Sequence, residues 1–236
     1  PGTIKASSIG FAESSSAESP FARQTAEKLG VPIAVEMFDE ATARARLPDA
    51  LLAYDEPFGD SSSLATYLLS SHVARDYKVA LGGDGGDEVF AGYKKYMVAH
   101  LRRPFAAVPR IRDLVGHALG KVPVVHDRTR AWTEVLRTVR RVSRGLVGSD
   151  AHVYTQLTQV VSLAHTAPLM REATNPARFE LEAHVRFERA HGNELQRSLA
   201  TDLGSMLCND MLVKVDRASM ACHLEARVPF LDHRVA

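Results

Sequence analysis

The chain has 236 residues, of which 45% are apolar and 24% are charged, and its formal net charge is +1. This composition excludes an intrinsically disordered chain, because disorder needs low hydrophobicity and a high net charge. No apolar run approaches the ~20 residues of a membrane span, and the first residues lack the basic and then apolar pattern of a secretory signal. We therefore expect a globular, cytoplasmic protein with a sizeable core and no membrane partner.

Strands and helices alternate over the first 93 residues. Apolar segments typical of strands occupy residues 3–11, 32–38 and 77–81, and the last is apolar enough to be buried. Capping residues and prolines predict helices from Ser19-Pro20 to Gly30, from Asp39 to about Leu47, from Pro48 to Tyr54, and from Asp60 onward. The alternation predicts an α/β fold with a parallel, doubly wound sheet.

Helical periodicity dominates the rest of the chain. We therefore divide the chain into an α/β part, residues 1–96, and a mostly helical part, residues 97–236. Val108-Pro109 and Val122-Pro123 mark turns between helices.

Residues 101–150 form a basic block, with 11 basic residues against 4 acidic ones. Four arginines share one face of an expected helix, namely Arg137, Arg140, Arg141 and Arg144. Such a face can bind a polyanion, or it can be an ordinary solvated face. We favour the solvated face and expect no nucleic-acid partner, because only Trp132 lies nearby to stack on bases.

Cys208 and Cys222 are the only cysteines, and no CxxC pair or neighbouring histidine suggests a metal site. We expect two small buried residues in a reducing compartment, although a disulfide is not excluded by the sequence.

The most informative segment is Gly-Gly-Asp-Gly-Gly-Asp-Glu at residues 82–88, which we call the glycine-rich loop. It follows an expected strand and precedes an expected helix, so it lies at the sheet edge where open α/β folds bind ligands. Glycines let the backbone approach a phosphate, while the carboxylates of Asp84, Asp87 and Glu88 would need Mg²⁺ between them and that phosphate. The loop therefore predicts a metal–polyphosphate site, and the alternative is a turn whose aspartates cap a helix.

A second segment, residues 210–234, is dense in alternating charges between apolar residues. It is typical of a helix with exposed ion pairs, followed by a turn at Pro229. The alternative is that at least one of four charged side chains points back at the glycine-rich loop, from Lys214, Arg217, Glu225 or Arg227.

Four runs together resemble the synthetase domain of glutamine-dependent asparagine synthetases. They are Ser8-Ile9-Gly10-Phe11, Asp55-Glu56-Pro57-Phe58-Gly59-Asp60-Ser61-Ser62, GGDGGDEVFAGY from Gly82, and KVDRASMA to EARVPFLDHR from Lys214. Their order and separation match the family, so the resemblance covers essentially the whole chain and is weakest over residues 97–195.

The resemblance implies a Rossmann-like fold of the ATP-pyrophosphatase type and the cofactors ATP and Mg²⁺. It implies that a carboxylate, aspartate in the namesake enzyme, is activated as an acyl-adenylate and then attacked by ammonia from a glutaminase domain. Carried over by position, cofactor-binding residues would be Ile9, Gly10, Gly82, Gly83, Gly85 and Gly86, and Asp87 would bind Mg²⁺. The candidate catalytic residues are Asp84, Lys214, Arg217, Glu225 and Arg227, the last four in a supporting role.

Three family elements are not found in these 236 residues. They are the Ser-Gly-Gly-x-Asp-Ser phosphate loop, the later catalytic lysine and the glutaminase domain with its N-terminal cysteine. We therefore expect an internal piece of a longer enzyme that has no synthetase activity alone. Two other functions stay open: an amidotransferase acting on another carboxylate, and a non-catalytic polyanion-binding module. The sequence is compatible with a homodimer but does not establish one.

Overall fold

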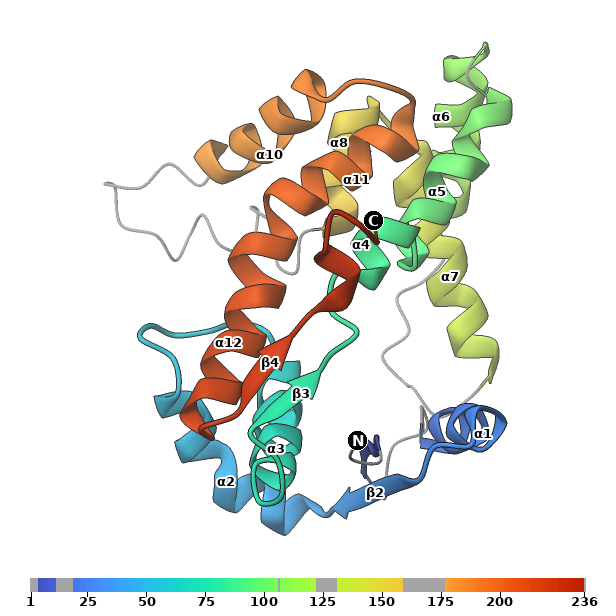
Figure 1. Ribbon diagram of the computed structural model, residues 1–236. Coiled ribbons are helices and arrows are strands. Elements are labelled where there is room, and N and C mark those ends of the chain that lie inside the picture. Colours follow the sequence, from blue (N-terminus) through green and yellow to red (C-terminus); the bar gives the residue numbers. More distant parts are fainter. Residues whose placement is uncertain (1–3, 12–18, 106, 122–130, 159–176, 236) are drawn as a thin grey trace. The chain divides into compact units, whose positions relative to one another are not determined.

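The computed structural model describes residues 4–11, 19–105, 107–121, 131–158 and 177–235 (Figure 1). The chain divides into two compact units. We call Pro1–Gly85 together with Cys208–Ala236 the sheet unit, and Gly86–Leu207 the helical unit. The borders of these units lie after Gly85 and after Leu207, whereas the sequence analysis divided the chain after residue 96. The second border arises because α12 and β4, near the end of the chain, belong to the sheet unit.

The sheet unit contains parallel strands, as the sequence predicted. β1 (Ala6–Phe11) pairs in parallel with β2 (Ile33–Phe38), and β3 (Val79–Leu81) pairs in parallel with β4 (Glu225–Arg227). Among the described residues these strands form two separate two-stranded sheets rather than one continuous sheet. β4 was not predicted, because two of its three residues are charged and no apolar pattern marks it.

The prediction that residues 77–81 are buried is wrong for the side chains of β3. Val79 is 42% exposed and Leu81 is 72% exposed. Alternate residues of a strand face the same side, so these two side chains share one face, and only the small Ala80 turns to the other.

The helices of the sheet unit are α1 (Ser19–Leu29), α2 (Glu40–Leu52), α3 (Ser62–Val73) and α12 (Leu212–Ala221). Two predicted helix starts are confirmed, α2 by its N-cap Asp39 and α3 by a hydrogen bond to Asp60, one residue before its N-cap Ser61. The Asp39 carboxylate accepts a hydrogen bond from the Thr42 N–H at 2.7 Å, and the Asp60 carboxylate accepts one from the Ser62 N–H at 2.8 Å. Gly30 follows α1 with a φ of 64°, the left-handed conformation expected of a glycine that ends a helix.

Pro48 does not restart a helix, as was predicted, but lies inside the continuous helix α2. A proline in a helix interior costs about 3 kcal/mol because it removes one backbone hydrogen bond. Packing offsets this cost, since Ala50 is 2% exposed and belongs to a core cluster with Tyr67 of α3 and Ala218 of α12.

The helical unit confirms the predicted helical periodicity. Its α-helices are α4 (Gly86–Phe90), α5 (Lys94–Arg102), α6 (Pro109–Gly120), α7 (Ala131–Leu146), α8 (Asp150–Thr158), α10 (Ala177–Arg189) and α11 (Glu194–Gly204). Ala151, Tyr154 and Phe187 form a buried cluster between α8 and α10, with the two ring centroids 5.2 Å apart. No helix in the described part of the chain is long and apolar enough to cross a membrane.

Part of the basic block lies outside the described residues, whereas both cysteines are described. The four arginines lie on α7, as predicted, but the side chains of Arg137 and Arg141 are outside the described residues, as is the turn at 122–123. Neither Cys208 nor Cys222 forms a disulfide. Cys208 is exposed, which contradicts the prediction that both are buried, and Cys222 is half-buried.

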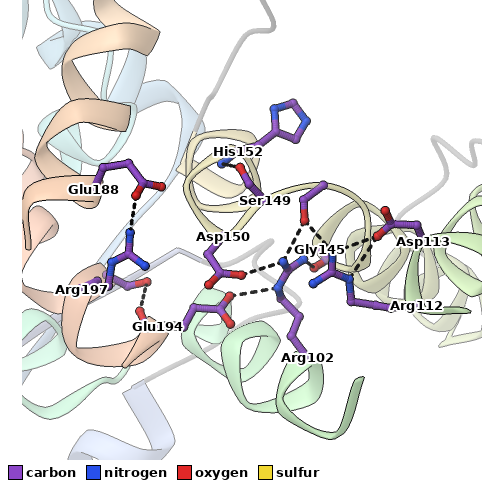
Figure 2. Close-up of polar contacts among 12 residues, drawn as sticks. Arg102, Arg112, Asp113, Gly145, Ser149, Asp150, His152, Glu188, Glu194 and Arg197 are labelled. Atoms are coloured by element: carbon purple, nitrogen blue, oxygen red, sulfur yellow. Dashed lines mark hydrogen bonds and ion pairs between the residues drawn. The ribbon is translucent and has the colours of Figure 1, made fainter. Parts of the chain in front are cut away.

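A buried arginine connects the helices of the helical unit (Figure 2). Arg102 is 2% exposed and donates hydrogen bonds to the carbonyl oxygens of Gly145 and Gly148, at 2.7 and 2.9 Å. It also donates to Asp150 at 2.8 Å, and its Nε lies 3.2 Å from a carboxylate oxygen of Glu194. One guanidinium therefore holds the C-terminus of α5 against α7, α8 and α11.

Glu194 makes the stability of this unit depend on pH. Burial, and then the negative charge of Asp150, raises the pKa of Glu194 from 4.5 to about 7, although Arg102 opposes the shift. A raised carboxyl pKa means that the folded protein binds a proton more tightly than the unfolded chain. This contribution to stability is complete below the unfolded pKa and is lost as pH rises through the folded one.

We therefore expect Glu194→Gln to flatten the pH dependence of stability. From about pH 5 to about pH 8, the free energy of unfolding should fall more steeply in the unsubstituted protein than in this variant. Denaturant unfolding at a series of pH values measures the two slopes. Glu182→Gln is the matched control, because Glu182 pairs with Arg186 on the surface, and its slope should equal that of the unsubstituted protein. Equal slopes for all three proteins would contradict the assignment.

Candidate functional site

The end of β1 carries Ile9 and Gly10. Ile9 lies opposite Glu36 in the β1–β2 register and is half-buried. A Cβ on Gly10 would lie 2.6 Å from the Met37 sulfur and 3.1 Å from the Ser19 hydroxyl oxygen. Gly10 thus allows β2 and the start of α1 to approach the strand closely, a packing reason for this glycine that is independent of any ligand.

The first half of the glycine-rich loop continues the β3–β4 pairing. The Gly82 N–H donates a hydrogen bond to the Arg227 carbonyl oxygen at 2.8 Å. A Cβ on Gly82 would lie 2.8 Å from a carboxylate oxygen of Asp84, so the Asp84 side chain folds back over Gly82. A Cβ on Gly83 would meet nothing within 4 Å. The carboxyl end of β3 therefore presents an open backbone at Gly83 beside the Asp84 carboxylate.

Gly85 has a structural requirement of its own. Its φ of 84° lies in the left-handed region that favours glycine, and a Cβ there would overlap the side chain of Leu231. The turn Pro229–Leu231 therefore packs directly on this part of the loop. Packing and backbone conformation account for Gly85 without a cofactor contact.

The carboxylates of α4 point in different directions. Asp87 is exposed, whereas Glu88 is 1% exposed and accepts a hydrogen bond from the Tyr93 hydroxyl at 2.7 Å. The expectation that Glu88 serves a metal is therefore wrong, because its carboxylate is turned into the interior of the helical unit. A sequence pattern cannot separate adjacent carboxylates, but successive residues of a helix point about 100° apart around its axis.

The described residues contain no group of three or more histidine, cysteine, aspartate or glutamate side chains that could hold a metal ion. Asp87 alone is an exposed carboxylate at the start of α4. Mg²⁺ commonly takes one or two protein carboxylates and completes its shell with water and substrate phosphates. The donor set therefore fits a metal that arrives with a nucleotide, and it does not resemble a site that encloses a resident ion.

Lys214 lies in a buried ion pair with Asp60 in the sheet unit. Its ammonium group donates to an Asp60 carboxylate oxygen and to the Ser62 hydroxyl, both at 2.8 Å, and Lys214 is 8% exposed. The Tyr54 hydroxyl donates to the Lys214 carbonyl oxygen at 3.3 Å. This group of residues, which we call the Lys214 cluster, joins the start of α3 to the start of α12.

Hydrogen bonds in the Lys214 cluster stabilise the ionised form of Asp60. Burial raises the pKa of Asp60, but hydrogen bonds from Lys214 and Ser62 outweigh burial, and the net pKa is lowered. The neighbouring Asp210 behaves differently: burial, and then the negative charge of Asp60, raises its pKa, although Lys214 opposes the shift. Burial and the same Asp60 charge raise the pKa of Tyr54 to about 12, so this phenol stays protonated.

The other three charged side chains make exposed pairs. Arg217 lies 2.9 Å from Asp55, and both side chains are about half exposed or more, at 49% and 80%. On β4, Arg227 donates to Glu225 at 2.7 Å, and this pair is exposed as well. Surface pairs of this kind contribute little to stability, about 0–1 kcal/mol.

The described contacts do not support the alternative in which a charged side chain of residues 210–234 points at the glycine-rich loop. Lys214 and Arg217 contact Asp60 and Asp55 rather than the glycine-rich loop. Arg227 does reach the loop, but through its carbonyl oxygen and Gly82, not through its guanidinium. The structure therefore joins residues 55–62 to residues 214–217, and the loop to the segment after α12.

Sequence reasoning missed the acidic partners in the Lys214 cluster. Asp60 was noted as the start of a helix and as part of the run from Asp55 to Ser62, but neither it nor Asp210 was predicted to contact Lys214. A lysine among apolar residues on a helix is a weak signal for a distant carboxylate, since buried charges need partners. The partner itself lies 154 residues away in the sequence, so no local pattern could identify it.

Comparisons with known proteins lead to the same family as the motifs in the sequence. The family model described as "Asparagine synthase" matches residues 1–236. The chain is 24% identical over 233 residues to "Asparagine synthetase [glutamine-hydrolyzing] 1" of Bacillus subtilis, covering 98% of this chain and 35% of that protein. It is 27% identical over 226 residues to "Putative asparagine synthetase [glutamine-hydrolyzing]" of Mycobacterium bovis, covering 96% of this chain and 33% of that protein.

The chain is also similar, over a shorter stretch, to a protein with a different name. The chain is 34% identical over 114 residues to "Amidase chyE" of Penicillium rubens, covering 48% of this chain and 17% of that protein. No solved structure matches the chain significantly. The chain thus spans about a third of the length of the asparagine synthetases that it matches, at 35% and 33%.

Proposed function

The chain belongs to the asparagine synthase family, and we propose that it is the synthetase domain of a glutamine-dependent asparagine synthetase with a Rossmann-like fold of the ATP-pyrophosphatase type. The observation that supports this most is the edge formed by β3 and β4. There the glycine-rich loop leaves the strand with an open backbone at Gly83, and Asp84 folds beside it. Parallel α/β sheets bind nucleotides at such carboxyl edges.

The proposed reaction has two steps. An oxygen of the aspartate side-chain carboxylate attacks the α-phosphorus of ATP, and the bond to the β-phosphate oxygen breaks to release pyrophosphate. Ammonia then attacks the acyl carbon of the aspartyl-adenylate, AMP leaves, and a proton is lost as the amide forms. Mg²⁺, bound as part of the ATP substrate, offsets the negative charge that grows on the leaving pyrophosphate.

The proposed roles fall on the end of β1, on the glycine-rich loop and on the segment from Lys214 to Arg227. Ile9, Gly10, Gly82 and Gly83 bind the nucleotide through surfaces without bulky polar groups, and Gly85 and Gly86 shape the loop that follows. Asp84 lies near the reacting carboxylate, and Asp87 contacts the metal. Lys214, Arg217, Glu225 and Arg227 support the site through the pairs described above.

The ammonia is proposed to come from a glutaminase domain elsewhere in the full-length protein. The names of the similar proteins from Bacillus subtilis and Mycobacterium bovis, which include the words glutamine-hydrolyzing, support this partner. An alternative substrate, a carboxylate other than that of aspartate, is favoured by the similarity to "Amidase chyE" over the part of the chain that matches it.

Exchange of labelled pyrophosphate into ATP tests the function. We expect the full-length protein to catalyse this exchange when aspartate is present, with activity at least about tenfold above the level without any acid. Glutamate and a panel of other carboxylic acids are the comparison substrates, and formation of the amide from ammonia is measured in parallel. Exchange that depends on another acid would select the alternative substrate, and no exchange with any acid would overturn the adenylation step.

A further inference from the structure

The Asp87 carboxylate and Gly92 are in close contact within the helical unit. A Cβ added to Gly92 would overlap an Asp87 carboxylate oxygen and would lie 2.8 Å from the carboxylate carbon. Asp87 therefore occupies the space that any side chain at position 92 would take. Because the φ of Gly92 is not in the left-handed region, backbone conformation does not account for this glycine, whereas the contact with Asp87 does.

The backbone after α4 turns back to make this contact. Ala91 has a φ of 59°, which is uncommon for a residue with a side chain and costs of order 1 kcal/mol. The turn brings the Gly92 N–H to the Asp87 carbonyl oxygen, with a hydrogen bond of 3.0 Å. Gly92 therefore contacts Asp87 twice: its N–H binds the Asp87 carbonyl oxygen, and its Cα lies against the Asp87 carboxylate.

Tyr93 fixes the turn on its other side. Its hydroxyl donates to the buried Glu88 carboxylate at 2.7 Å, and burial and then this hydrogen bond raise the pKa of Tyr93 well above its usual value. The hydroxyl therefore remains a donor. The Lys95 ammonium lies 5.1 Å from the centroid of the Tyr93 ring and bonds Asp202 of α11 at 2.8 Å. These contacts anchor the turn to the core of the helical unit.

We propose that Gly92 is a positioning residue: the turn at residues 91–93 sets the orientation of the Asp87 carboxylate toward the metal of Mg·ATP. This proposal rests on the proposed function, which gives Asp87 its metal contact. A methyl group at position 92 would force the Asp87 side chain into another rotamer, and the exposed end of that side chain can move without disturbing the core. The methyl group would also lie 3.2 Å from the Asp87 Cα, a tight contact that the backbone must relieve by a small shift. The main effect should therefore fall on metal affinity, with a small loss of stability.

Gly92→Ala and Gly120→Ala form a matched pair of variants. Gly120 lies at the end of α6 in the same unit, and a Cβ there would meet only the Ser143 hydroxyl oxygen at an ordinary 3.7 Å. Binding of Mn²⁺ in the presence of ATP is followed by electron paramagnetic resonance in the full-length protein. We expect Gly92→Ala to weaken Mn²⁺ binding by about tenfold or more, and Gly120→Ala to leave it unchanged.

The same variants are measured in pyrophosphate exchange at increasing Mg²⁺. Excess Mg²⁺ should largely restore the rate of Gly92→Ala, because the ligand is displaced and not removed, and thermal unfolding should show that this variant is folded, with a midpoint at most slightly below that of Gly120→Ala. If Gly92→Ala binds Mn²⁺ as tightly as Gly120→Ala while Asp87→Ala loses binding, the positioning role is overturned and the metal contact stands. If Asp87→Ala itself binds Mn²⁺ normally, the metal contact in the proposed function is overturned.

Discussion

Replacing Asp202 by alanine is expected to destabilise the protein by about 3–5 kcal/mol, the cost of removing one member of a buried charge pair. Asp202 of α11 is completely buried and accepts three hydrogen bonds. They come from Lys95 at 2.8 Å, Tyr96 at 2.5 Å and Tyr154 at 2.8 Å. Without the carboxylate, two buried hydroxyls would lose their acceptor, and the Lys95 ammonium, 13% exposed, would keep only the Met206 sulfur at 3.6 Å.

The tyrosines increase this cost because they cannot adapt by losing a proton. Burial is the main cause that raises the pKa of both Tyr96 and Tyr154, and Asp202 raises it further. Both hydroxyls therefore stay protonated and need an acceptor. Asp202→Asn keeps one acceptor oxygen without the charge, so we expect its stability to lie between those of the alanine variant and the unsubstituted protein.

Denaturant unfolding measures the difference, and Glu188→Ala is the control. Glu188 pairs with Arg197 at 2.9 Å and is 51% exposed, so its loss should cost at most about 1 kcal/mol. A loss for Asp202→Ala no larger than for Glu188→Ala would show that the buried pair contributes nothing beyond a surface pair.

Asp87→Ala is expected to reduce pyrophosphate exchange by about a hundredfold or more, because it removes the carboxylate proposed to hold Mg²⁺ where charge develops. Asp87 is exposed and lies in the first turn of α4, so its loss should leave the free energy of unfolding almost unchanged. The measurement uses the full-length protein at saturating ATP and aspartate.

Asp76→Ala is the control for Asp87→Ala. Asp76 is also an exposed aspartate and lies in the turn between α3 and β3, outside the glycine-rich loop. Its exchange rate should equal that of the unsubstituted protein. If Asp87→Ala exchanges pyrophosphate at the full rate at ordinary Mg²⁺, Asp87 does not bind the metal. This result would contradict the metal contact without contradicting the asparagine synthetase function.

Local signals in the sequence predicted the local structure well. Asp39, Asp60 and Gly30 lie at helix ends, as their capping chemistry requires. The same reasoning failed at Pro48, where packing around Ala50 outweighs the preference of proline to end a helix. It also missed β4, whose pairing with β3 depends on a partner strand and not on its own residues.

The sequence predicted which segments of the chain form the candidate site, but not which of their side chains contact one another. Resemblance to a family identified the glycine-rich loop and the run from Lys214. It could not indicate that Lys214 faces Asp60, or that Glu88 turns inward while Asp87 faces solvent. Those outcomes depend on tertiary packing and helix rotation, which a single sequence does not encode locally.

The pairing of β3 with β4 has a consequence for the order of events during synthesis. The first strand of this pair ends at Leu81, whereas its partner begins at Glu225, after the whole helical unit has been made. A ribosome therefore delivers every helix of Gly86–Leu207 before the sheet unit can be completed. The helices are rich in local contacts and can form early, while β3 must wait for its partner strand. We therefore expect the nascent chain to carry an unpaired strand edge until β4 emerges.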